Sequence, residues 1–284
     1  MVKNRLQWEV FVSAQIPVLT NNLAPSATDM KWSPISSTLI SGERDAVLVD
    51  TAITVDQNQK LVDWIVASGK NLTAIYATHG HGDHFFGVHT IQRAFPGARF
   101  VTRKEAIDVM REQASDAVVE SYWKSRFPGQ IDSTLVVADE LEGGVLELEG
   151  EQLVSVSLGH TDTDSTTCLH VPSIALAVCG DALYNDVHLH LGESGAEGRK
   201  EWIAALDTIE SLKPIAAIAG HKRPGASDTP DNIEATRKYI RDFDSIACGT
   251  ETTLELYEEM LAIYPDRVNP AVLWLSAQAV KPGT

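Results

Sequence analysis

The chain has 284 residues, of which 44% are hydrophobic and 22% charged, an ordinary balance for a globular protein with a full core. Its formal net charge is −16, from 39 acidic and 23 basic residues. This negative field repels polyphosphate backbones, so we expect no nucleic-acid partner. Three cysteines with no C-x-x-C pair argue against a disulfide framework and favour a reducing compartment.

We expect a cytoplasmic protein with no membrane partner. No stretch approaches the roughly 18 uninterrupted apolar residues that suggest a membrane span. Glu9 and Gln15 interrupt the N-terminal segment, so it lacks the clean apolar run of a signal peptide.

The first half of the chain alternates predicted strands and helices. β-branched and alternating apolar residues predict strands, and apolar residues at helical spacing predict helices. The strands are expected at 7–20, 38–50 (with a turn at 41–45), 72–79 and 98–102, and the helices at 55–68, 86–95 and 104–125. Gly69 is the expected C-cap of the helix over 55–68.

The second half follows the same logic. Strands are predicted at 146–160, 166–181 (split at Pro172) and 215–221, and helices at 200–214, 229–245 and 250–263. No Pro-, Gly- or Ser-rich linker divides the halves, so we predict one α/β domain over 1–284, with a C-terminal helical extension from about residue 229. The apolar tail over 250–280 could pack on its own core or on a second subunit, which leaves a homodimer open.

Several predicted strands end on a histidine or an aspartate. These ends are Asp50, His79, His160, Asp181 and His221. In α/β enzymes, functional sites are assembled where strand ends converge on one edge of a sheet. We therefore expect these side chains to meet.

THGHGDHFFG, residues 78–87, concentrates metal-binding groups in one short loop. It holds His79, His81, Asp83 and His84. Imidazole and carboxylate suit zinc, and to a lesser degree iron or manganese. Gly80 and Gly82 remove side-chain bulk, so a tight loop can turn several ligands inward. One loop cannot complete two coordination shells, and the later strand ends at His160, Asp181 and His221 are the natural additional donors.

This motif and the later strand ends resemble the metallo-β-lactamase-fold hydrolases, over roughly residues 35–225. The resemblance implies a four-layer αββα sandwich that binds two divalent metal ions, preferably zinc, at one edge of its sheets. By position it places His79, His81 and His160 on the first ion. It places Asp83, His84 and His221 on the second, with Asp181 as the bridge. Asp50 would hold the histidine loop without being a ligand.

The resemblance also implies a reaction. Metal-bound hydroxide would attack an ester, lactone or amide carbonyl of a small-molecule substrate, and Asp83 would shuttle a proton. Tyr184 stands three residues after Asp181, where quorum-quenching lactonases have a tyrosine that donates to the substrate carbonyl oxygen. Those lactonases carry H-T-P-G-H around the third histidine, whereas residues 159–166 read GHTDTDST, so the resemblance does not extend to their acyl-homoserine lactones.

Two alternatives on the same fold stay open. One is a glyoxalase II-like thioester hydrolase, which needs basic residues for glutathione carboxylates, and Lys222, Arg223 and Lys238 are scattered candidates. The other is an iron-dependent sulfur redox enzyme.

Substrate selectivity is assigned to two segments. The first is 111–135, where Tyr122, Trp123 and Phe127 could line an apolar pocket. The second follows Tyr184 and contains His188 and His190, for which rim or packing roles are favoured over ligation.

Overall fold

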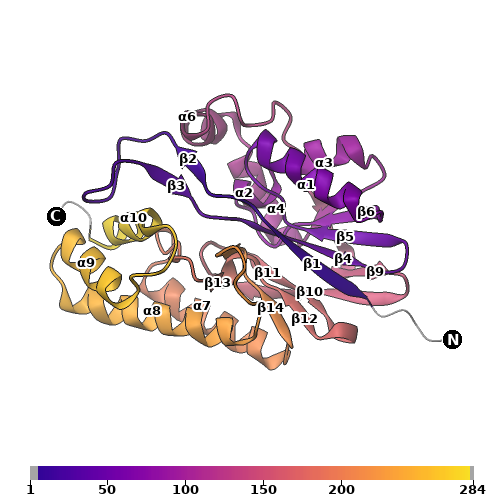
Figure 1. Cartoon of the computed structure of the whole chain (residues 1–284). Coiled ribbons are helices and arrows are strands. Elements are labelled where there is room, and N and C mark those ends of the chain that lie inside the picture. The colour runs from indigo at the N-terminus through magenta and orange to yellow at the C-terminus, as the bar shows by residue number, and fades with distance from the viewer. Residues whose placement is uncertain (1–5, 282–284) are drawn as a thin grey trace.

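The computed structural model describes residues 6–281 and contains two main β-sheets (Figure 1). The six-stranded sheet runs in the order β1 (Gln7–Val12), β4 (Ser36–Ser41), β5 (Asp45–Val49), β6 (Asn71–Tyr76), β7 (Arg99–Thr102), β8 (Asp139–Glu140). The five-stranded sheet runs in the order β14 (Ala216–Ile218), β12 (Leu176–Val178), β11 (Thr166–Val171), β10 (Glu151–Gly159), β9 (Val145–Leu148). Two short ribbons pair β2 (Ile16–Val18) with β3 (Met30–Trp32), and β13 (Tyr184–Asn185) with β15 (His221–Lys222).

Helices cover the outer faces of both sheets. Those of the first half are α1 (Val55–Ala67), α2 (Gly82–Phe85), α3 (Val88–Ala94), α4 (Lys104–Gln113), α5 (Asp116–Val118), the π-helix η1 (Val119–Trp123) and α6 (Lys124–Arg126). Those of the second half are α7 (Ala196–Ser211), α8 (Asp231–Gly249), α9 (Thr253–Ile263) and α10 (Pro270–Val280). Short 3-10 turns are η2 (Glu142–Gly144), η3 (Pro172–Ile174) and η4 (Gly180–Ala182). None of the helices within 6–281 has the length and hydropathy needed to cross a bilayer.

Three apolar clusters define four layers. Strand side chains alternate between faces, so in β5 Leu48 joins the helix-side cluster with Leu61 of α1, whereas Val47 faces the other sheet. The central cluster joins side chains of both sheets, and a third packs Trp202 of α7 and Phe243 of α8 on the second sheet. Figure 1 shows α1 and α3 on one side of the paired sheets and α7 and α8 on the other. The predicted αββα sandwich is confirmed.

Strand direction brings the predicted chemistry to one edge. β5 and β6 are parallel, as are β12 and β14, and β10 and β12 share a direction because each is antiparallel to β11. The segments that follow these strands therefore emerge together. They carry Asp50, the histidine loop, residues 160–162, Asp181 and His221.

Two predicted elements were wrong in their continuity. The strand over 7–20 is divided, because Ser13 turns to Ile35, exchanging backbone and side-chain hydrogen bonds with it, and β2 then pairs with β3 instead. The helix over 104–125 is also divided. Its first part ends at Gln113, and the Ser115 hydroxyl caps a new helix by accepting from the Val118 amide.

The C-terminal segment packs on the same chain and includes a helix, α10, that the sequence did not predict. Pro270 begins this helix after Asn269, which has a left-handed backbone. Leu273 and Ala277 are fully buried in the cluster that α7 and α8 form with the second sheet.

Leu273→Ala should lower the free energy of unfolding by about 2–5 kcal/mol, because it leaves a cavity in this cluster. Leu254→Ala, on the exposed side of α9, is the matched control and should change it by no more than roughly 0.5 kcal/mol. Urea denaturation of both variants measures the difference. Equal losses would contradict the integral packing of α10.

Candidate metal centre

The histidine loop after β6 is shaped by close backbone packing. A Cβ on Gly80 would lie 2.5 Å from the Val109 side chain, and one on Gly82 would lie 2.6 Å from Phe86. Both positions therefore need glycine for steric reasons, as the sequence suggested. The loop leads into the single-turn helix α2, on which Asp83 and His84 are buried.

One group of metal-binding atoms comprises His79, His81 and Asp162. Asp162 Oδ2 lies 3.0 Å from His81 Nδ1 and 3.7 Å from His79 Nε2. The Thr161 hydroxyl donates to Asp162 Oδ1 at 2.9 Å, so only Oδ2 faces the imidazoles. Asp162 is fully buried, so its carboxylate is not hydrated by bulk solvent. Burying it costs free energy unless nearby groups compensate the charge.

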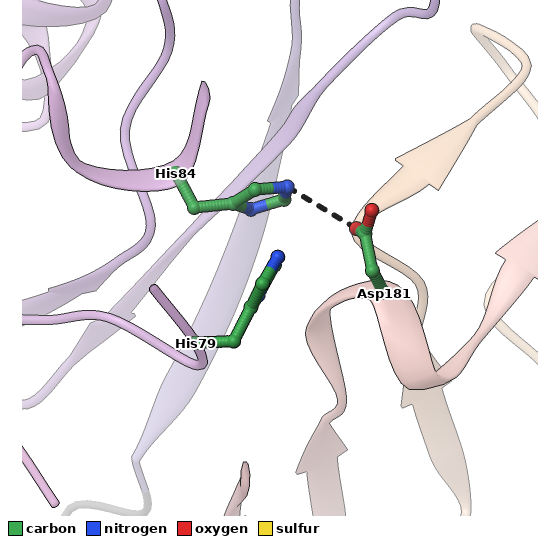
Figure 2. A group of neighbouring side chains, drawn as sticks. All are labelled: His79, His84 and Asp181. Atoms are coloured by element: carbon green, nitrogen blue, oxygen red, sulfur yellow. Dashed lines mark ion pairs between the residues drawn. The ribbon is translucent and has the colours of Figure 1, made fainter. Parts of the chain in front are cut away.

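A second group comprises Asp83, His84 and His221, and Asp181 contacts two of its members. Asp181 Oδ1 lies 3.2 Å from His84 Nε2, and Oδ2 lies 3.2 Å from His221 Nε2. Figure 2 shows the imidazoles of His79 and His84 directed toward the space beside Asp181. The same three residues form a further group of closely spaced donor atoms, so Asp181 lies where it can link the two groups.

The outward nitrogen of each imidazole is held by another partner. His221 Nδ1 donates to the Pro34 carbonyl oxygen at 2.9 Å, and His84 Nδ1 lies 3.1 Å from Asp50 Oδ2. These partners require an Nδ1 proton in the neutral ring, because a carbonyl or an ionised carboxylate can only accept. If His84 and His221 are neutral, their Nε2 lone pairs face the carboxylate oxygens of Asp181. Both groups are then hydrogen-bond acceptors, so no hydrogen bond forms between them.

Asp50 holds the histidine loop through two routes. Its Oδ1 accepts from the Thr78 amide at 2.8 Å, and its Oδ2 accepts from the Thr78 hydroxyl at 2.8 Å. That hydroxyl is 3.0 Å from His79 Nδ1, so Asp50 supports His79 through Thr78 and His84 directly. His81 is supported from elsewhere, with Nε2 3.4 Å from Glu193 Oε2.

The electrostatics of the centre call for positive charge. Burial raises the pKa of Asp181, but His221 and His84 outweigh it and hold that pKa well below its usual range. Burial lowers the pKa of His84, yet Asp181 and Asp83 hold it well above its usual range. His79 Nε2, His84 Nε2, Asp162 Oδ2 and Asp181 Oδ1 are buried without a hydrogen-bond partner. Divalent metal ions between these atoms would satisfy all of them, so the donor set fits metal ions.

His160 lies apart from these groups among the described residues. Its Nδ1 is 2.6 Å from Asp164 Oδ1, and its Nε2 is 2.9 Å from Ser194 Oγ. The ring thus ties the loop after β10 to the segment before α7. Asp162 fills the place beside His79 and His81 instead. Sequence reasoning missed it, although the GHTDTDST departure from H-T-P-G-H puts this carboxylate at the lactonase proline position.

Tyr184 reaches the centre from β13. Its hydroxyl donates to Asp181 Oδ2 at 2.8 Å, and its ring is buried beside His221. Burial and the Asp181 carboxylate raise the pKa of Tyr184 well above its usual range, so the phenol keeps its proton at neutral pH.

A cavity of about 250 Å³ adjoins the centre. Tyr122 and Trp123 line it, as the sequence suggested, and so does His190. Phe127 does not belong to this lining and lines a second cavity instead. His188 is a buried core residue.

Neither buried cysteine belongs to a candidate metal group. Cys179 Sγ lies 3.7 Å from Cys168 Sγ inside the apolar core, and both are free thiols.

The family model of the metallo-beta-lactamase superfamily matches residues 30–221, which is more than half of the chain. The chain belongs to the metallo-β-lactamase superfamily. This membership indicates a metal-dependent hydrolase, and the His/Asp groups described above could bind its metal ions.

Curated members of the superfamily are similar at low identity. A hydroxyacylglutathione hydrolase of Synechococcus sp. strain CC9902 is 29% identical over 182 residues, which are 62% of this chain. The chain spans only 58% of the length of that relative. A metallo-beta-lactamase type 2 of Bacteroides fragilis is 22% identical over 74% of this chain and 76% of its own length.

Solved structures of the superfamily share the fold. A metallo-beta-lactamase family protein from Thermus thermophilus superposes with a TM-score of 0.64 at 19% identity, covering 95% of this chain and 91% of its own. A metallo-beta-lactamase from Pontibacter korlensis has a TM-score of 0.60 at 16% identity, covering 84% of this chain and all of its own.

The buried His188 should make this superfamily member less stable in mild acid. Burial and Arg267 lower the pKa of His188 to about 3 from 6.5. Between about pH 3 and pH 6.5, His188 is protonated in the unfolded chain but neutral in the folded chain. The free energy of unfolding should therefore fall as pH drops below 6.5, by up to ~1.4 kcal/mol per pH unit from this group.

His188→Gln should flatten that slope, because glutamine does not titrate, as measured by urea denaturation over a pH series. Tyr239→Phe is the control. It removes the hydroxyl that lies 2.8 Å from His188 Nδ1 but keeps the titrating ring, so its slope should stay. An unchanged slope in His188→Gln would rule out this assignment.

Proposed function

We propose that this protein is a dinuclear metal-dependent hydrolase that opens an ester, lactone or amide bond of a small molecule. The observation that carries the proposal is a set of four buried atoms, two imidazole nitrogens and two carboxylate oxygens, that lie close together without hydrogen-bond partners. It has no structural benefit without cations, because each unpaired polar atom costs free energy when buried. Superfamily membership supports the hydrolytic class.

The residues divide into two ligand sets in this proposal. His79, His81 and Asp162 would hold one ion. Asp83, His84 and His221 would hold the other, and Asp181 lies between the two sets and would contribute to both. Metal ions bound in such a pair lower the pKa of bound water to ~7 and polarise a carbonyl oxygen.

Two pocket residues can act on protons or on the substrate. Burial raises the pKa of Asp83, but His84 and His221 hold it below its usual range, so its carboxylate is ionised at neutral pH. We propose Asp83 as the group that shuttles a proton. The Trp32 indole donates to Asp83 Oδ2 at 3.0 Å and fixes that carboxylate. Tyr184 keeps its proton, and we propose that its single hydroxyl hydrogen turns from Asp181 to the oxygen on which charge develops as the carbonyl is attacked.

A thioester hydrolase is the second candidate. It is favoured by the Synechococcus relative, which carries the name hydroxyacylglutathione hydrolase. It would use the same buried ligands and differ in the group that the pocket must hold.

The proposed reaction can be tested with a chromogenic panel of esters, lactones, thioesters and β-lactams. Protein of measured metal content should hydrolyse at least one carbonyl substrate, and chelation should abolish the rate, because water loses its activation. Readdition of zinc, manganese or iron to the stripped protein identifies the metal that restores it. Full activity after complete metal removal would contradict the proposal. Strong iron absorbance without hydrolysis would favour redox chemistry.

The ligand assignment predicts a contrast between two neighbouring positions. Asp162→Ala should lower the bound metal by about one ion per chain, because it removes a buried donor to the first set. His160→Ala is the matched control and should keep both ions, since its ring contacts Asp164 and Ser194. Metal content by mass spectrometry after dialysis measures this. Loss of an ion from His160→Ala alone would restore His160 to the ligand set that the family resemblance implied.

A further inference from the structure

Three distant pieces of the chain build the cavity beside the metal centre. They are the β2–β3 ribbon, the π-helical segment η1 with its neighbours, and the first turns of α10. Figure 1 shows the ribbon between α6 and α10 at one end of the molecule. The scaffold strands supply the metal-binding residues at the floor of this cavity, so the added pieces decide what else can enter.

Two tryptophan rings and apolar side chains of α10 form part of the cavity wall. The rings of Trp32 and Trp123 pack with centroids 5.5 Å apart. Both indole N–H groups are already bonded, to Asp83 Oδ2 at 3.0 Å and to Gln113 Oε1 at 3.1 Å. The two rings therefore offer apolar faces without a spare donor, and Val272 and Leu275 of α10 extend this surface.

The described residues of the lining include three carboxylates and three imidazoles. Among the described residues that line the cavity there is no lysine or arginine, whereas Asp83, Asp181 and Glu193 contribute carboxylates. The Glu193 carboxylate lies 3.4 Å from His81 Nε2 and 3.6 Å from His190 Nε2. It therefore stands at the cavity with imidazole neighbours but with no lysine or arginine partner among the lining residues.

The basic residues that could have held a substrate carboxylate are engaged elsewhere. Lys222 is buried against Asp228, and Lys238 pairs with Asp242 one helical turn away. Arg223 donates to the Asp266 carbonyl oxygen. None of the three lines the cavity.

The cation nearest to the aromatic wall is also directed away. The Arg126 guanidinium stacks over the Tyr122 ring at 3.7 Å from its centroid, and Arg126 lines the second cavity instead. The guanidinium therefore covers the Tyr122 ring without becoming part of the cavity lining.

We propose that the substrate of this site is an uncharged acyl compound with an apolar body, such as a neutral ester or lactone, and that substrates bearing a free carboxylate are selected against. This inference rests on the proposed hydrolytic function and names its substrate class. A carboxylate in the cavity would be desolvated beside Glu193 without a lysine or arginine to pair with it. A glutathione thioester has two carboxylates, and each would incur this desolvation penalty.

Equilibrium binding tests the preference directly. Butyranilide and succinanilic acid have the same four-carbon acyl chain and differ in a terminal methyl against a carboxylate. On metal-loaded protein, titrated by calorimetry, butyranilide should bind at least about tenfold more tightly. Equal or tighter binding of succinanilic acid would overturn the proposal, as would undetectable binding of butyranilide.

Adding a positive charge to the lining locates the effect in this cavity. Val118→Lys places an ammonium on the lining and should narrow the preference by about fivefold or more, through stronger binding of succinanilic acid. Val118→Met is the matched control, since it adds similar length without charge and should keep the preference. Circular dichroism verifies that both variants fold. A folded Val118→Lys variant with the parental preference would show that the acyl chain binds elsewhere.

Matched esters separate this inference from the proposed function. The 4-nitrophenyl esters of butyric acid and of succinic acid are compared after subtraction of protein-free rates. Faster hydrolysis of the butyrate ester supports both claims. Faster hydrolysis of the succinate ester supports the hydrolase and overturns the substrate class. If neither ester is cleaved while butyranilide keeps its binding advantage, the substrate class stands and the proposed reaction fails.

Discussion

Buried negative charge at one edge of the two sheets is the constraint on which the rest of the site depends. Asp83, Asp162 and Asp181 are each no more than 4% exposed, and the carboxylates lie against imidazoles. A buried charge is tolerated only when it is paired and hydrogen-bonded. Trp32, Thr161 and Tyr184 each donate one hydrogen bond to these carboxylates, and in the absence of a bound cation the positive charge beside them comes from protonated imidazoles. Bound metal ions would supply this positive charge in place of the imidazole protons.

The scaffold behind this charge restricts each imidazole to one useful orientation. The Pro34 carbonyl, Asp50 and the Thr78 hydroxyl lie behind His221, His84 and His79, respectively. Partners of this kind fix the ring and its tautomer, which is how outer residues tune a metal site. Asp50 itself adopts a left-handed backbone at the end of β5, and its amide donates to the Tyr76 carbonyl. Asp50, at the end of β5, therefore supports His79 and His84, which follow the neighbouring strand β6.

The candidate metal-binding groups and the walls of the adjoining cavity come from different parts of the molecule. The donor groups follow strands of the two central sheets, whereas the cavity walls come from the β2–β3 ribbon, η1 and α10. Trp32 links the two systems, since its indole fixes Asp83 while its ring forms part of the wall.

The sequence by itself determined the fold class and most of the donor atoms. Local periodicity marks buried strands, and the H-x-H-x-D-H spacing places several ligands on one loop, so neither inference needs long-range contacts. The predicted strand ends at Asp50, Asp181 and His221 do meet at this edge for the same reason. Even the elements predicted at 55–68 and 72–79 lie within a few residues of α1 and β6.

Only the tertiary structure decided which side chains of the loop after β10 turn inward. His160 and Asp162 are two positions apart in a turn, where no period specifies direction. Ser194, more than thirty residues later, holds His160 aside, while Thr161 orients Asp162 toward His79 and His81. The sequence pattern also did not predict the division of the helix over 104–125 or the packing of α10. They depend on a serine cap and on packing between segments far apart in sequence, which local pattern cannot encode.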